Sequence, residues 1–152
     1  MGTRSTIALE FANGSIGQVY CHWDGYLSYN GKILLDHYSD PWKLRDLIDL
    51  GSLSTLGPEL GVKHPFDNPH PYDTADYVEW RLARKGDCTF YGRDRGEYSV
   101  EATYFVDFAD YVNNLDREEY NYILLNNGCW YVAVEYTNMS EFSELKAELQ
   151  KD

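Results

Sequence analysis

The chain is organised around one stretch, Val19-Tyr20-Cys21-His22-Trp23-Asp24-Gly25-Tyr26. It continues a predicted strand and stops at Asp24-Gly25, a residue pair typical of tight turns. An imidazole, an indole, a carboxylate and phenols therefore arrive at one corner of the molecule. We expect a binding site there, with ligand contacts from Tyr20, His22, Trp23, Asp24 and Tyr26.

The residues before this stretch predict a hairpin. Residues 5–11 alternate, with Ile7, Leu9 and Phe11 on one face, which is the periodicity of a strand. A turn at 12–15 is followed by a second strand, Ile16 to Trp23.

The residues after the corner predict two helices. After a loop at 27–31, a short helix is expected at 32–38. A second begins at Ser39-Asp40-Pro41, where a capping side chain precedes proline, and ends at Gly51. Its expected apolar face is Trp42, Leu44, Leu47 and Ile48.

Residues 51–75 contain Pro58, Pro65, Pro69 and Pro71, which forbid long regular structure. We interpret this segment as an ordered flap within one domain, 1–152; a disordered linker is the alternative. The stretch supplies no separate core, so the chain is not divided there.

Two further hairpins are predicted beyond the flap. Residues 77–85 alternate, with Val78, Trp80 and Leu82 on one face, and 88–91 run back as the partner strand. A possible strand at 98–104 and a helix at 105–115 follow. The third hairpin joins 119–125 to 129–136 around Asn126-Asn127-Gly128. A last helix, capped by Ser140, completes the prediction of an α+β fold. Its antiparallel sheet is built from three hairpins, with short helices packed on one face.

The net charge of −12 disfavours direct nucleic-acid binding and anionic membranes, since phosphate contacts need cations. Residues 97–152 carry −9 of it. Their acids would either imitate the phosphates of a duplex or simply solubilise the protein; they are Asp107, Asp110, Asp116, Glu118, Glu119, Glu141, Glu144 and Glu148.

The three cysteines (Cys21, Cys88, Cys129) form no C-x-x-C pair and favour reduced thiols in a cytoplasm. Together with the four histidines they match no zinc spacing, so neither a metal nor a cofactor is expected. No apolar run reaches the length of a membrane helix.

Two groups of residues suggest chemistry. His22 and Asp24 share a face of the expected strand and would be a ligand-contacting pair, an acid–base pair, or a structural hydrogen bond with Trp23 in the core. Arg93 and Arg95, flanked by Gly92 and Gly96, would hold an anion such as phosphate, or pair with surface carboxylates.

The segments Ser5-Thr6-Ile7-Ala8 and Gln18 to Tyr26, followed by Gly31 and His37-Tyr38, resemble a family of small bacteriophage and prophage proteins. That family shares a tyrosine-x-His-Trp-Asp-Gly-Tyr core; here Leu27 replaces the proline expected after the second tyrosine. The resemblance covers residues 3–50 and implies a phage origin and the cytoplasm of an infected bacterium. It assigns no catalytic residue.

These observations lead us to expect a non-enzymatic protein that counteracts a bacterial antiviral defence by sequestering a nucleotide-derived signal. Tyr20, Trp23 and Tyr26 would stack on the base, while Arg93 and Arg95 would hold phosphate. The alternatives are an acidic, protein-directed inhibitor and a small nucleotide hydrolase using His22 and Asp24. Homo-oligomerisation is compatible with each of these.

Overall fold

The computed structural model of the chain describes residues 3–61, 71, 73–84, 86–115, 117–134 and 142–151, with the backbone alone at 80, 81, 83 and 84. Within this part, eight strands form one sheet. They are β1 (Ser5–Glu10), β2 (Ile16–Cys21), β3 (Leu53–Thr55), β4 (Thr89–Phe90), β5 (Thr103–Phe105), β6 (Tyr120–Leu124), β7 (Trp130–Val134) and β8 (Ser143–Glu144).

The sheet has the order β4-β3-β2-β1-β6-β7-β8, with β5 paired to β2 beyond this path. The α+β class is confirmed, but the sheet is mixed and not antiparallel throughout. β1 pairs parallel to β6, and β2 pairs parallel to β3. Two of the three predicted hairpins, β1–β2 and β6–β7, are confirmed.

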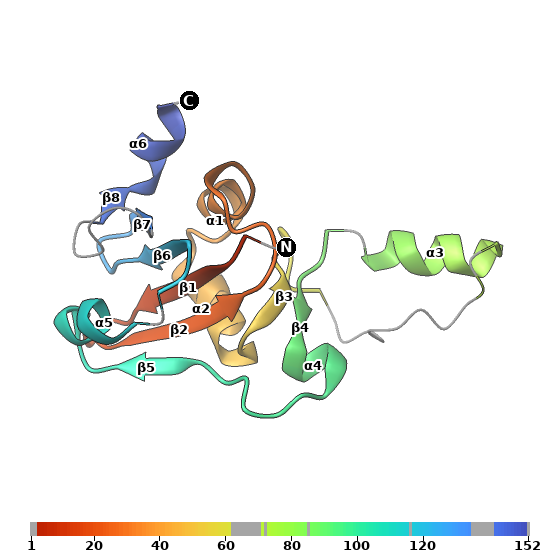
Figure 1. Cartoon of the computed structure of the whole chain (residues 1–152), viewed down its shortest axis with the longest axis horizontal. Helices are drawn as coiled ribbons and strands as arrows, with labels where there is room; N and C mark the ends of the chain where they lie inside the picture. The colour runs from red at the N-terminus through yellow and green to blue at the C-terminus, as the bar shows by residue number, and fades with distance from the viewer. Residues whose placement is uncertain are drawn as a thin grey trace.

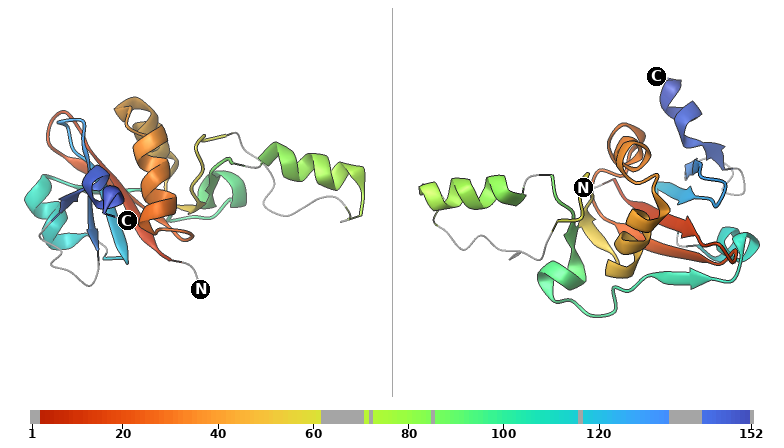
Figure 2. Two further views of the ribbon diagram at one scale, coloured as in Figure 1. Left: turned by 90° about the horizontal axis from the view of Figure 1, so that it is seen from above. Right: turned by 180° about the vertical axis from the view of Figure 1, so that it is seen from behind.

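Helices cover both faces of the sheet, not one as predicted (Figure 1; Figure 2, left). The apolar residues of α1, α2 and α6 join Ile7 and Leu9 in the larger core, whereas α5 packs with Ala8 on the other face. Alternate residues of β1 thus serve two cores. The helical segments are η1 (Leu27–Gly31, one π-helical turn), α1 (Lys32–His37), α2 (Pro41–Leu50), α3 (Ala75–Arg84), α4 (Tyr91–Arg95), α5 (Phe108–Asn114) and α6 (Leu145–Gln150).

α2 begins as predicted. Asp40 accepts the backbone N–H of Trp42 at 3.0 Å, and Pro41 occupies the first turn. Leu44, Leu47 and Ile48 are buried, but Trp42 is 71% exposed, so its assignment to the apolar face was wrong. The first turn of α2 therefore leaves an indole on the surface.

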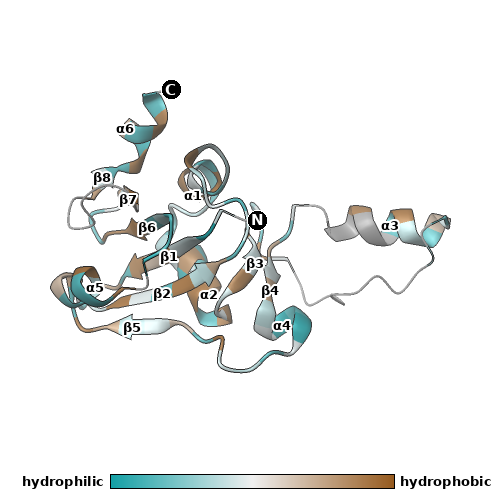
Figure 3. Ribbon diagram, in the orientation of Figure 1, coloured by the Kyte–Doolittle hydropathy of each residue, from teal (hydrophilic) through white to brown (hydrophobic). Residues whose placement is uncertain are grey.

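The second predicted hairpin was wrong. Residues 75–84 form the helix α3, which projects away from the sheet (Figure 1). Val78 and Leu82 fit period two but also lie four residues apart, which is one helical turn. Both stay exposed, and Figure 3 shows hydrophobic and hydrophilic bands along this helix. The partner expected at 88–91 contributes only β4, which pairs with β3.

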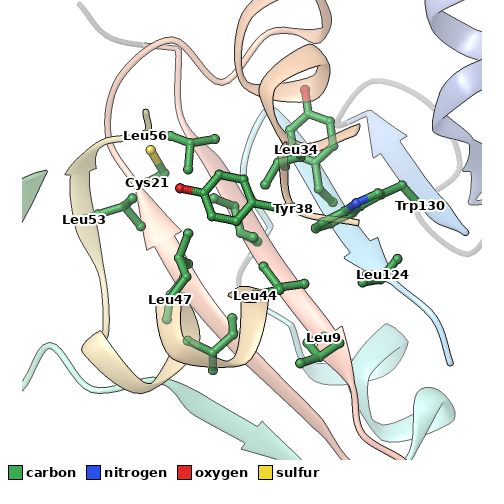
Figure 4. Packing of buried hydrophobic residues seen from close by; sticks show 14 of the residues in the cluster. Leu9, Cys21, Leu34, Tyr38, Leu44, Leu47, Leu53, Leu56, Leu124 and Trp130 are labelled. Carbon is green, nitrogen blue, oxygen red and sulfur yellow. The ribbon is translucent and has the colours of Figure 1, made fainter. Parts of the chain in front are cut away.

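The larger core is closed by Tyr38, whose ring lies among leucines from α1, α2 and β3 (Figure 4). Its hydroxyl donates to the carbonyl of Gly57 at 2.6 Å. Burial raises the pKa of this phenol above its usual range. The start of the predicted flap is thus attached to the core, and it includes β3.

Most of the remaining flap, at 62–70 and 72, lies outside the described residues. The same holds for Ser140, the predicted cap of the last helix. The helix itself begins later, at Leu145, and a short strand, β8, precedes it. None of the described helices has the length and apolar character needed to cross a membrane.

Candidate functional site

The corner after β2 is built by hydrogen bonds of its backbone. The N–H groups of His22 and Trp23 donate to the carbonyls of Leu53 and Ser54 at 3.1 and 3.0 Å, extending the parallel pairing beyond β2. Asp24 then takes a positive φ of 57°, which ends the strand alternation. The chain turns away from the sheet here.

Gly25 is required at this turn by close packing. A Cβ atom at this position would lie 2.7 Å from the carbonyl oxygen of Thr3 and 2.8 Å from the Cβ of Ser5. Its carbonyl accepts a hydrogen bond of 2.6 Å from the Tyr122 hydroxyl. The corner is therefore clamped between the start of β1 and the middle of β6.

The buried side chain of Asn30 holds the corner in place through hydrogen bonds. Its buried Nδ2 donates to the Trp23 carbonyl at 3.1 Å and to the Ser5 hydroxyl at 3.3 Å, and lies 3.5 Å from the Cys21 sulfur. Burial raises the pKa of the Cys21 thiol to about 12, so this thiol is a packing group and not a nucleophile. No sequence pattern pointed to Asn30, which follows the motif by four residues.

Five rings lie above this frame, and we call them the aromatic corner: Tyr20, His22, Trp23, Tyr26 and Tyr29. Trp23, Tyr26 and Tyr29 are 42%, 38% and 37% exposed. The His22 ring meets Trp23 edge to face at 4.7 Å, and Tyr26 lies 6.1 Å from Tyr29. Ring contacts join Tyr20, His22 and Trp23 in one group and Tyr26 and Tyr29 in a second, and Tyr29 was not among the predicted residues.

His22 is paired within the corner, but not with Asp24. Its Nδ1 lies 2.7 Å from the Tyr20 hydroxyl. Partial burial raises the pKa of this phenol, and the charge of Arg4 opposes the rise. Among the described residues no hydrogen bond joins His22 to Asp24, because the turn at Asp24 breaks the strand geometry on which that pairing depended.

The start of α4 is adjacent to the corner. Ser52, just before β3, accepts the Tyr91 N–H at its carbonyl and the Tyr20 N–H at its hydroxyl. The Tyr91 phenol also hydrogen-bonds with Ser54, whose carbonyl holds Trp23. The corner and α4, the helix that carries Arg93 and Arg95, therefore lie close together.

The Arg93 guanidinium nonetheless bonds with groups of the protein itself. Its guanidinium donates to the carbonyls of Leu60, Gly61 and Cys88 and forms two bonds with the carboxylate of Asp94. Its side chain is 12% exposed and that of Asp94 is fully buried. Arg93 ties the start of the flap to β4, so it is not positioned to bind phosphate.

Two other cations flank the corner. Arg95, 45% exposed, pairs with Glu97 at 3.1 Å, and its charge acts on the Tyr91 phenol. Arg4, exposed just before β1, acts in the same way on Tyr20. Sequence reasoning missed Arg4 because it lies far from the motif along the chain and reaches it only through the β1–β2 pairing.

The acidic residues of the C-terminal third do not share one surface. Asp107 and Asp110 serve local bonds at the start of α5, on one face of the sheet. Glu144 and Glu148 belong to α6 or its cap, which packs with the opposite core. Asp116 and Glu141 lie outside the described residues, and within the described part no three His, Cys, Asp or Glu side chains form a metal-binding group.

Comparisons with models of protein families, with curated proteins and with solved structures found no match to this chain. We therefore infer function from the geometry of the site.

Proposed function

We propose that this chain is a non-enzymatic binding protein that holds a planar, nucleotide-derived molecule against the aromatic corner. The observation that carries the proposal is the combination of partly exposed rings with an immobile frame. Trp23 and Tyr26 keep about two-fifths of their surface in solvent, although their backbone is clamped by Asn30, Gly25 and Tyr122. Rings presented in this way stack on a base with little ordering cost.

The anionic part of such a ligand would be held by Arg4 and Arg95 rather than by Arg93. Both guanidinium groups act on phenols at the corner, Arg4 on Tyr20 and Arg95 on Tyr91. Glu97 shares Arg95 and would release it to a doubly charged phosphate, because an exposed ion pair is weak.

The acid–base pair expected of His22 and Asp24, both among the described residues, is not formed. A general base needs a ring nitrogen free to take a proton and a group that orients it. Here Nδ1 bonds with the Tyr20 hydroxyl, and Asp24 does not serve as the orienting carboxylate. The pair is suited to recognising a ribose hydroxyl or a base edge through the other ring nitrogen.

The biological setting we propose is the neutralisation of a bacterial antiviral defence by a phage-encoded protein. The support is the resemblance of the Tyr20–Tyr26 motif to small phage proteins. Capture of a nucleotide signal accounts for paired cations in an acidic protein better than duplex imitation does, because the acids of α5 and α6 face different sides of the sheet.

The test is a thermal-shift screen at low salt with linear and cyclic nucleotides, including cyclic ADP-ribose forms. A ligand at 100 times its dissociation constant should stabilise the fold by about 2.7 kcal/mol. Trp23→Ala should abolish the shift. Tyr98→Ala is the matched control, because Tyr98 is 93% exposed and lies outside the corner.

Bound ligand is then released by heat and its mass is measured. An intact ligand supports capture, whereas an altered ligand identifies an enzyme. No shift across the panel, or an equal loss in both variants, would contradict nucleotide capture at the corner and favour a protein partner.

A further inference from the structure

The opposite end of the β1–β2 hairpin contains a hollow of about 320 Å³. Three separate parts of the chain line it: residues 9–12, the first turn of α2, and residues 124–128 of the β6–β7 turn. Leu9 and Leu124, which Figure 4 shows at the edge of the core, belong to its lining and are nearly fully buried. The volume lies in the range of small-molecule sites.

The walls of this hollow are apolar and aromatic. Phe11 follows β1, while Pro41 and Trp42 open α2. Trp42 is 71% exposed, which is costly for an indole in the absence of a ligand that covers it. Its backbone is held at the start of α2, since Asp40 accepts the Trp42 N–H.

One cation stands at the rim. The Arg45 guanidinium lies 5.8 Å from the ring centre of Phe11 and 6.0 Å from that of Trp42. Among the described residues, these ring faces are its only recorded partners, and no ion pair engages it. A guanidinium held between two rings and without a carboxylate partner is prepared to receive an anion.

The other charged groups nearby are Glu10 and Asp49. Glu10 also lines the hollow, but its carboxylate accepts the Asn126 N–H at 2.9 Å and thereby fixes the β6–β7 turn. Asp49 lies with Arg45 and Tyr104 along a second, more polar hollow that adjoins the first at Phe11. Arg45 is therefore the charged side chain of the apolar hollow that has no described polar partner, and its charge is positive.

We propose that this hollow binds a small organic acid with a planar apolar body. The body would lie against Phe11 and Trp42 over the leucine floor, on the side away from the guanidinium, and the anionic group would pair with Arg45. The site is independent of the aromatic corner, because it lies at the Glu10–Ile16 end of the hairpin and the corner lies at the Ser5–Cys21 end.

The experiment uses two fluorescent probes of similar shape. Anilinonaphthalene sulfonate carries an anionic group on a planar body, and N-phenyl-naphthylamine has the same body without the charge. The folded chain should bind the sulfonate with micromolar affinity. Arg45→Gln should weaken this at least roughly tenfold and leave the neutral probe unchanged, since only the charged contact is lost. Trp42→Ala should weaken both probes.

Two variants serve as controls. Lys146→Gln makes the same charge change on α6, outside the hollow, and should leave sulfonate binding unchanged. Trp23→Ala should also leave it unchanged, which separates this site from the corner. Circular dichroism and urea unfolding establish that each variant is folded.

Three outcomes would overturn the proposal: no binding of either probe, equal weakening of both probes by Arg45→Gln, or unchanged binding in Trp42→Ala. If Trp23→Ala lost binding and Trp42→Ala retained it, the probe would bind at the aromatic corner, and this result would also overturn the proposal. Because nucleotides are tested separately, the two proposals fail independently.

Discussion

The two ends of the first hairpin differ in how their polar groups are used. At the Cys21 end, Asn30 Nδ2 and the Tyr122 hydroxyl donate to the backbone carbonyls of Trp23 and Gly25, although the buried Oδ1 of Asn30 has no hydrogen-bond partner among the described residues. At the Glu10 end, a cavity remains open and the one arginine at its rim contacts only rings. The stretch rich in unusual residues thus forms the aromatic corner and its backbone frame, which we call the platform. The hollow, by contrast, is lined by residues that form no motif in the sequence.

The largest effect should come from Arg93, which joins Leu60 and Gly61 to Cys88 and Asp94. Arg93→Ala removes the guanidinium from the buried carboxylate of Asp94 and should cost about 3 kcal/mol of unfolding free energy. Arg95→Ala should cost less than about 1 kcal/mol, because its ion pair is exposed. Urea unfolding followed by circular dichroism measures both; equal values would return Arg93 to the list of ligand residues.

The rigidity of the platform is tested more narrowly at Gly25. Gly25→Ala places a methyl group 2.7 Å from a backbone oxygen and should cost about 2 kcal/mol. Gly92→Ala is the matched control, because it lies in a helix and its Cβ would meet a Val100 methyl group at 3.3 Å and the Glu97 carbonyl oxygen at 4.0 Å. We expect the control to change stability by less than about 0.5 kcal/mol. A tolerated Gly25→Ala would show that the corner adapts.

The smallest perturbation is chemical labelling, which leaves the fold intact. Cys21 lies buried beneath the platform, whereas Cys129 follows the β6–β7 turn at the open end and is partly exposed. With a disulfide reagent at neutral pH, Cys129 should react roughly a hundredfold faster than Cys21, whose reaction requires local opening. Mass spectrometry of timed samples assigns each thiol; fast labelling of Cys21 would contradict a rigid corner.

Much of the fold could be predicted from local pattern. The β1–β2 and β6–β7 hairpins have clear alternation and turn residues, and α2 has its Asp40-Pro41 start. The failure at 77–85 is physical: Val78 and Leu82 satisfy both the strand and the helix period. β3 has three residues, too few to show a period, and the strand expected at 98–104 is reduced to β5 at its end; both pair with β2.

The site was predictable only where it is local. The rings of Tyr20 to Tyr26 gather because they are neighbours in sequence. By contrast, no local rule shows that Arg93 would meet the carbonyls of Leu60 and Gly61, or that Phe11 would face Arg45. Such contacts depend on how strands pair across the sheet, and the parallel pairs are the ones that the pattern did not predict.

The pairing of β1 with β6 has a consequence during synthesis. The hydroxyl of Thr6 donates to the side chain of Asn121, and 115 residues separate the two. At typical ribosomal rates, β1 waits roughly 6 to 23 seconds for this neighbour to be made. The nascent hairpin exposes Ile7 and Leu9 along an unpaired edge during that interval. We expect the emerging chain to depend on ribosome-associated chaperones.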